Sequence, residues 1–156
     1  MKRFSILFIA LLFSFTAFSQ QALFGGQNIG SPEIHDDNTV TFRFYAPKAV
    51  KVQVTGDFLP TQKMQTPYGE YDGPGAADLT EGKDGVWEFK TPSPLAPELY
   101  SYSFIVDGLK VTDPNNVYLN RDVASITNIF IIKGDRGDLY SVNNVPHGTV
   151  ARRWYD

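Results

Sequence analysis

The stretch from Leu99 to Pro114 constrains the fold of this chain more than any other. Its first arm alternates between apolar residues on one face and serines on the other, as a half-buried β-strand does: Tyr100, Tyr102, Phe104 and Val106 against Ser101 and Ser103. Asp107-Gly108 suits a two-residue hairpin turn, because both residues tolerate positive φ angles. Asp113-Pro114 ends the return arm, since proline has no N–H to donate. The stretch therefore predicts a hairpin whose aromatic face lies in a core.

Further segments with the same alternation predict an all-β fold. They are Thr39–Ala46, Val50–Thr55 and Val86–Lys90, and a last strand is expected around Ile126–Ile132. Residues 61–85 are polar and lack this periodicity, so they are expected to form a long loop, and residues 115–122 a polar turn. No segment has a convincing helical period. The sequence predicts one β-sandwich of about 100 residues over 32–133.

The N-terminus has the pattern of an export signal. Lys2 and Arg3 precede an apolar run, and Ala17-Phe18-Ser19 offers small residues for cleavage after Ser19. The run is too short for a good membrane span, which needs about 20 residues. We therefore expect a signal peptide over 1–19, a Gly-rich linker over 20–31, a secreted or periplasmic protein, and no membrane attachment after cleavage.

Composition excludes several function classes. The chain has 156 residues, a net charge of −3 and no cysteine, so zinc knuckles, iron–sulfur clusters and cysteine nucleophiles are excluded. A mildly acidic chain without a basic cluster is a poor nucleic-acid binder. Acidic residues do gather in the polar segment 61–85, but their spacing matches no calcium loop: Glu70, Asp72, Asp78, Glu81 and Asp84. We interpret them as solvated and expect neither a metal nor a cofactor.

Catalysis by this chain is not expected. Serine-esterase chemistry needs a nucleophile on a Gly-x-Ser-x-Gly elbow, a histidine base and an acid, and the sequence contains no such elbow. The two histidines, His35 and His147, have no nucleophile that the sequence places beside them. We therefore predict that the chain is not an enzyme.

The order of the strand motifs resembles that of a known module. The sequences at Phe42–Pro47, Val52–Asp57, Gly85–Trp87, Tyr100–Gly108 and Asp113-Pro114 are similar to those of early-set immunoglobulin-like modules of the glycogen-binding type, carbohydrate-binding module family 48. The resemblance covers residues 32–133 and implies an immunoglobulin-like β-sandwich. Such modules precede the catalytic domains of branching enzymes and of many bacterial esterases.

The C-terminal segment suggests which catalytic domain would follow. Val145–Val150 and Arg153–Tyr155 resemble the first strand of carbohydrate esterase family 1 domains, so residues 134–156 are expected to be a linker and the start of a truncated esterase domain. The sequence thus predicts a non-catalytic accessory module that orients a serine esterase domain absent from this chain. The alternative is a stand-alone extracytoplasmic module that binds a plant or storage polysaccharide.

The resemblance also identifies candidate site positions. Glycogen-binding members hold the sugar with two tryptophans, a lysine and an asparagine, and the matching positions here are Thr61, Ser103, Lys110 and Thr127. The aromatic stacking surface is therefore missing, which argues against glycogen or starch binding at the usual site. Two tyrosines in the polar segment, Tyr68 and Tyr71, could instead form a sugar-stacking or partner-contact surface or fold back over the sandwich. We predict Tyr68, Tyr71 and Lys110 as carbohydrate-binding residues.

Overall fold

A computed structural model describes residues 29–142, 144, 146 and 148–154. The expected signal peptide, most of the expected linker and His147 lie outside the described residues. Within the described part of the chain, no helix is long and apolar enough to cross a membrane.

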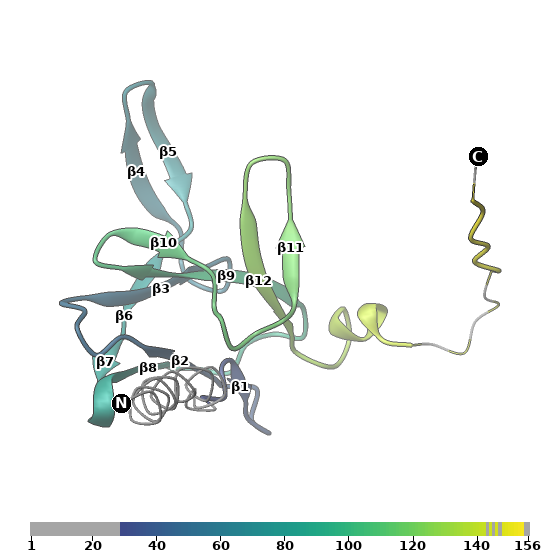
Figure 1. Cartoon of the computed structure of the whole chain (residues 1–156), viewed down its shortest axis with the longest axis horizontal. Coiled ribbons are helices and arrows are strands. Elements are labelled where there is room, and N and C mark those ends of the chain that lie inside the picture. Colours follow the sequence, from purple (N-terminus) through teal and green to yellow (C-terminus); the bar gives the residue numbers. More distant parts are fainter. Residues whose placement is uncertain (1–28, 143, 145, 147, 155–156) are drawn as a thin grey trace, which may run out of the picture.

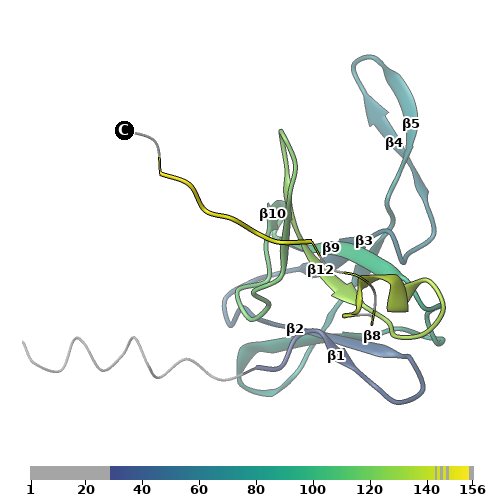
Figure 2. The ribbon, with the colours of Figure 1, turned by 90° about the vertical axis from the view of Figure 1, so that its right-hand side faces the viewer.

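Two antiparallel sheets pack face to face, as the two layers in Figure 2 show. The four-stranded sheet has the order β1 (Glu33–Ile34), β2 (Val40–Tyr45), β8 (Val86–Lys90), β7 (Thr80–Glu81). The six-stranded sheet has the order β11 (Leu119–Arg121), β12 (Ile126–Ile131), β9 (Leu99–Val106), β3 (Val52–Gly56), β6 (Ala76–Asp78), with β10 (Leu109–Val111) paired to β9. The predicted all-β sandwich is confirmed.

Strand β9 is the centre of the six-stranded sheet. One of its edges pairs with β3, and its other edge pairs first with β12 and then with β10. Its inward residues Tyr102 and Phe104 are buried, as the alternation predicts. Between ring centroids, Phe42 of β2 lies 5.0 Å from Tyr102, and Phe44 lies 4.7 Å from Phe104. The core is therefore an aromatic layer between the two sheets.

The predicted Asp-Gly turn joins β9 to β10. Asp107 and Gly108 both have positive φ angles, +48° and +87°, as the favoured two-residue hairpin turn requires. The Asp107 carboxylate also accepts hydrogen bonds from the backbone N–H groups of Val50 and Lys51, at 2.9 and 2.8 Å. This turn therefore also holds the chain that enters β3.

A buried polar network lies beside the aromatic core. The Tyr102 hydroxyl donates to a carboxylate oxygen of Asp113 at 2.8 Å and accepts from the Asn116 side chain at 3.1 Å. Asn128 accepts from the Asp113 backbone N–H at 2.7 Å. Burial, together with the Asp113 charge, raises the pKa of Tyr102. Asp113, predicted only as a turn residue, thus also fixes an internal hydroxyl.

The expectation that residues 61–85 form a loop is wrong. They form the β4 (Gln62–Thr66) and β5 (Gly69–Gly73) hairpin, then β6, β7 and a 3₁₀ turn at Lys83–Gly85. The hairpin pairs only with itself and stands clear of both sheets (Figure 1). Both of its faces meet solvent, so its strands show no alternation of apolar and polar residues. Likewise, β11 lies within the predicted polar turn.

Removal of the Phe104 side chain tests the assignment of the β9 face to the core. Phe104 is fully buried between the sheets, so Phe104→Ala should lower the free energy of unfolding by about 3–5 kcal/mol through the cavity it leaves. Urea denaturation measures this change. Tyr68→Ala is the control, because its ring is fully exposed and its loss should cost less than about 0.5 kcal/mol. Equal stability of Phe104→Ala and the parent chain would refute the assignment.

Candidate functional site

A groove lies on the outer face of the six-stranded sheet. Its volume is about 360 Å³, within the range of small-molecule sites. Strands β3, β9 and β12 form its floor, β10 borders it, and the base of the β4–β5 hairpin forms a wall. Its lining is rich in hydroxyl groups: Thr55, Thr61, Ser101, Ser103 and Thr127.

Three of these hydroxyls form a row across the floor. Thr55 of β3 pairs with Ser103 of β9, and the register of β9 with β12 places Thr127 on the other side of Ser103. The Thr55 hydroxyl donates to the Gly75 carbonyl at 2.8 Å. The Ser103 hydroxyl is buried at the centre of the row and has no hydrogen-bond partner among the described residues. The row therefore contains a polar group that the protein leaves unsatisfied.

Opposite charges border the groove at different points along β9. The Asp57 carboxylate accepts two hydrogen bonds from the Ser101 backbone N–H, at 2.9 and 3.1 Å. Burial raises the pKa of Asp57, while these hydrogen bonds act in the opposite direction. Lys110 lies across from Ile105, further along β9, and its ammonium has no ion-pair partner within the described part of the chain. The groove thus offers an acceptor near one end and a free donor near the other.

The four positions identified by the family resemblance converge on this groove. Thr61, Ser103, Lys110 and Thr127 all line it, although they come from four different parts of the fold. None has the residue type that the glycogen-binding pattern requires. Sequence reasoning missed Asp57, Thr55 and Ser101, which also line the groove; the outward positions of the alternating strands were the available signal.

The two predicted tyrosines lie on the β4–β5 hairpin and not in the groove lining. Tyr68 is fully exposed near the hairpin turn, so it does not fold back over the sandwich. Tyr71 is half exposed on β5. Of the three predicted carbohydrate-binding residues, the structure places Lys110 at the groove and the two tyrosines on the hairpin whose base forms a wall of the groove.

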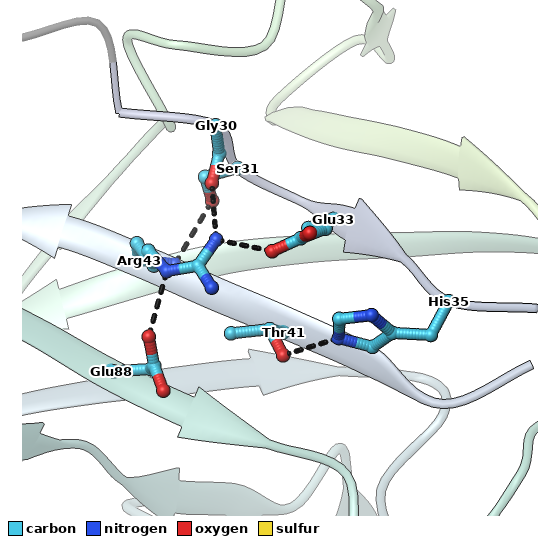
Figure 3. A network of polar contacts seen from close by, with 7 residues as sticks. All are labelled: Gly30, Ser31, Glu33, His35, Thr41, Arg43 and Glu88. Atoms are coloured by element: carbon cyan, nitrogen blue, oxygen red, sulfur yellow. Dashed lines mark hydrogen bonds and ion pairs between the residues drawn. The ribbon is translucent and has the colours of Figure 1, made fainter.

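The outer face of the other sheet carries an ionic network, shown in Figure 3. The Arg43 guanidinium contacts Glu33 at 2.6 Å and Glu88 at 2.7 Å and donates to the Gly30 carbonyl. His35 contacts the Thr41 hydroxyl at 2.8 Å. These contacts join β1, β2 and β8, so the charges of Arg43 are used within the sheet. We interpret this network as structural.

The acidic residues of segment 61–85 are spread over several elements. Asp72 pairs with Lys63 at 2.8 Å, and Asp78 pairs with Lys51 at 3.2 Å. No group of three or more acidic or histidine side chains that could hold a metal ion occurs among the described residues.

Comparison with known proteins identifies the family. Residues 26–119 match the model of carbohydrate-binding module 48, the isoamylase N-terminal domain. The chain therefore belongs to this family of carbohydrate-binding modules. It is 32% identical over 68 residues to the 1,4-alpha-glucan branching enzyme GlgB of Lactobacillus acidophilus, a match that covers 44% of this chain and 9% of the enzyme.

Solved structures of pullulanases are also similar. One, from Anoxybacillus sp. LM18-11 in complex with maltotetraose, is 17% identical with a TM-score of 0.45, over 80% of this chain and 16% of that chain. Another, from Bacillus acidopullulyticus, is 16% identical with a TM-score of 0.44, over 69% and 12%. The chain thus spans a small part of each of these relatives.

The expected link to an esterase finds no support. The sequence relative described above is a branching enzyme and not a carbohydrate esterase. Residues 148–154 form no strand, and Trp154 is almost fully exposed; the start of an esterase domain in this segment stays a prediction. The tail leaves the sandwich after a 3₁₀ turn at Gly137–Tyr140 (Figure 1).

Replacement of Ser103 tests whether its hydroxyl lacks a partner. Ser103→Ala removes a buried unsatisfied group, so the free energy of unfolding should stay unchanged or rise by up to about 3 kcal/mol. Thr55→Val is the matched control: it deletes a hydroxyl of the same row that does have a partner and should cost about 1 kcal/mol. Thermal or urea unfolding compares the two. A loss for Ser103→Ala as large as that for Thr55→Val contradicts the assignment.

Proposed function

We propose that this chain is a non-catalytic module that binds an α-1,4-linked glucan in the groove of its six-stranded sheet. The observation that carries the proposal is the hydroxyl-rich lining of the groove, in which Thr61, Ser101 and Thr127 are at least partly exposed and the unsatisfied Ser103 hydroxyl is buried beside Thr127. Two findings support the ligand class: the chain belongs to a carbohydrate-binding family, and the sequence relative is named as a 1,4-alpha-glucan branching enzyme.

In this proposal, hydrogen bonds dominate recognition at the groove. Hydroxyl groups both donate and accept, so Thr61, Ser101 and Thr127 can each do either with a sugar hydroxyl. Thr55 donates to the Gly75 carbonyl and is left only as an acceptor. Lys110 adds a donor and Asp57 an acceptor. The only aromatic residue in the lining is Tyr102, which is buried with its hydroxyl on Asp113. Sugar stacking inside the groove is therefore not part of the mechanism.

We further propose that the module works beside a catalytic domain of the glycoside hydrolase type. The support is the family itself, described as an N-terminal domain of isoamylase, and the match to a branching enzyme. The esterase partner expected from the tail is not retained. Residues 1–19 predict export of the protein, and a location outside the cytoplasm remains part of the proposal.

Calorimetric titration with maltooligosaccharides tests the ligand class. The chain should bind maltotriose or a longer member of the series, and xylooligosaccharides should give weaker binding or none. Binding of xylooligosaccharides alone would replace the α-glucan with a xylan-type ligand. Flat titrations across the whole panel, with glycogen included, would overturn the proposal.

Replacement of Lys110 tests the groove as the place of binding. Lys110→Met keeps an unbranched side chain but removes the charged donor, so the Kd for the bound oligosaccharide should rise about tenfold or more, as expected for one hydrogen bond to a charged group. Lys48→Met is the matched control, because Lys48 is an exposed lysine outside the groove. If Lys110→Met and Lys48→Met change the Kd equally, the ligand binds outside the groove.

A further inference from the structure

The β4–β5 hairpin carries a surface that lies mostly outside the groove. It stands away from the sandwich in both views of the ribbon (Figures 1 and 2). Its strands pair only with each other, from Gln62 with Gly73 to Thr66 with Gly69. A two-stranded ribbon has no core of its own, so its side chains are all available to a ligand unless they contact each other.

The two faces of the hairpin differ. One carries charged and amide side chains in cross-strand pairs, and the other, here called the Met64–Tyr71 face, carries Met64 and Tyr71 together with Gln62, Thr66 and two glycines. On the first of these faces, Lys63 pairs with Asp72 at 2.8 Å, and Gln65 donates to Glu70 across the strands. Because side chains alternate along a strand, the cross-strand pair of Met64 and Tyr71 lies on the opposite face. Met64 is 37% exposed and Tyr71 50% exposed. The polar pairs fix which way the tyrosine ring faces.

Two glycines on the Met64–Tyr71 face leave the tyrosine ring open to solvent. Gly69 and Gly73 flank Tyr71 at alternate positions of β5, so neither neighbour can cover the ring. Gly73 has a further role. A Cβ atom at this position would lie 2.6 Å from Met64 Cγ and 3.3 Å from Tyr71 Cε2, so the two side chains occupy the space above the glycine.

Gly73 also connects this face to the groove. It lines the groove together with its neighbours Asp72 and Pro74 and with Thr61 at the start of the other strand. The Tyr71 ring therefore lies directly against a residue of the groove wall. A chain that leaves the groove at this wall would meet an exposed aromatic side chain next.

We propose that Met64 and Tyr71 form an additional sugar-binding subsite, which holds a unit of a glucan chain beyond the units in the groove. An aromatic ring offers the C–H face of a sugar an apolar contact, and the groove residues supply its polar contacts. This inference rests on the proposed function. Tyr68, fully exposed near the turn, lies further along the same hairpin.

The narrowness of the hairpin favours a sugar chain over a protein partner. Stable protein interfaces bury about 800 Å² on each partner, over some 20–30 residues. The Met64–Tyr71 face offers one tyrosine and one methionine, beside Gln62, Thr66 and two glycines, on a ribbon of two strands. This surface suits one or two sugar units. It is continuous with a groove of the size that small ligands occupy.

The proposal is tested by the dependence of affinity on chain length. Maltotriose and maltoheptaose are titrated into the parent chain and into Tyr71→Ala, Tyr71→Phe and Tyr45→Ala. Maltoheptaose should bind Tyr71→Ala about two- to tenfold more weakly than the parent, as expected for loss of one ring contact. Maltotriose, which the groove holds, should bind the parent chain and Tyr71→Ala equally well. Tyr71→Phe should bind both sugars like the parent, because the ring remains.

Tyr45→Ala is the matched control, since Tyr45 is also 50% exposed but lies on β2 of the other sheet. It should leave both affinities unchanged. If Tyr71→Ala weakens both sugars equally, or weakens neither, the subsite does not exist although the groove still binds. If the parent chain binds neither sugar, the proposed function itself fails. Retained far-UV circular dichroism and thermal midpoint of each variant separate a lost contact from a lost fold.

Discussion

Strand β9 has one face in the core, one face at the groove and paired strands on both edges. The packing of the rest of the sandwich depends on this strand. Its inward side chains include the aromatic residues that meet β2 across the core, and its outward ones include Ser101 and Ser103. A slip of one residue in its pairing would turn Ser101 and Ser103 toward the core and Tyr102 and Phe104 away from it. Its position between β3 on one edge and β12 and β10 on the other leaves little freedom for such a slip. The hydroxyl row of the groove is therefore a direct result of core packing.

The polar network behind the groove gives its floor a fixed shape. Tyr102 and Asn128 precede and follow the floor residues Ser103 and Thr127 along their strands, with their side chains on the opposite face. Their hydrogen bonds to Asp113 hold these strands to the segment that follows β10. Because burial and the nearby carboxylate raise the pKa of Tyr102, its hydroxyl stays protonated and remains a donor. The groove floor is thus backed by satisfied polar contacts as well as by aromatic packing.

The sequence was informative wherever a strand has one buried face. Alternation predicted β2, β3, β8 and β9, because apolar residues occupy their inward positions. A strand was also expected at β12, where inward Asn128 and outward Ile129 break the alternation. Alternation could not predict the β4–β5 hairpin, whose two faces both meet solvent and whose strands are joined by pairs such as Lys63 and Asp72. The site positions came from the family resemblance, and only the folded structure brings Thr61 and Thr127 to the same groove. The tail resembled an esterase over too few residues to decide the partner.

The isolation of the β4–β5 hairpin has a consequence for how such a module can diverge. Because the hairpin pairs only with itself, its two strands can each lengthen or shorten by two residues without moving any strand of the sandwich. Steps of two preserve which side chains share a face, so Gly73 would still meet the groove and the polar pairs would still face away from Tyr71. In the proposed binding mode, insertions can therefore change how far the hairpin extends along a bound polymer without changing the stability of the sandwich. Gly73 at the base, above which the Met64 and Tyr71 side chains lie, is the fixed point of that variation.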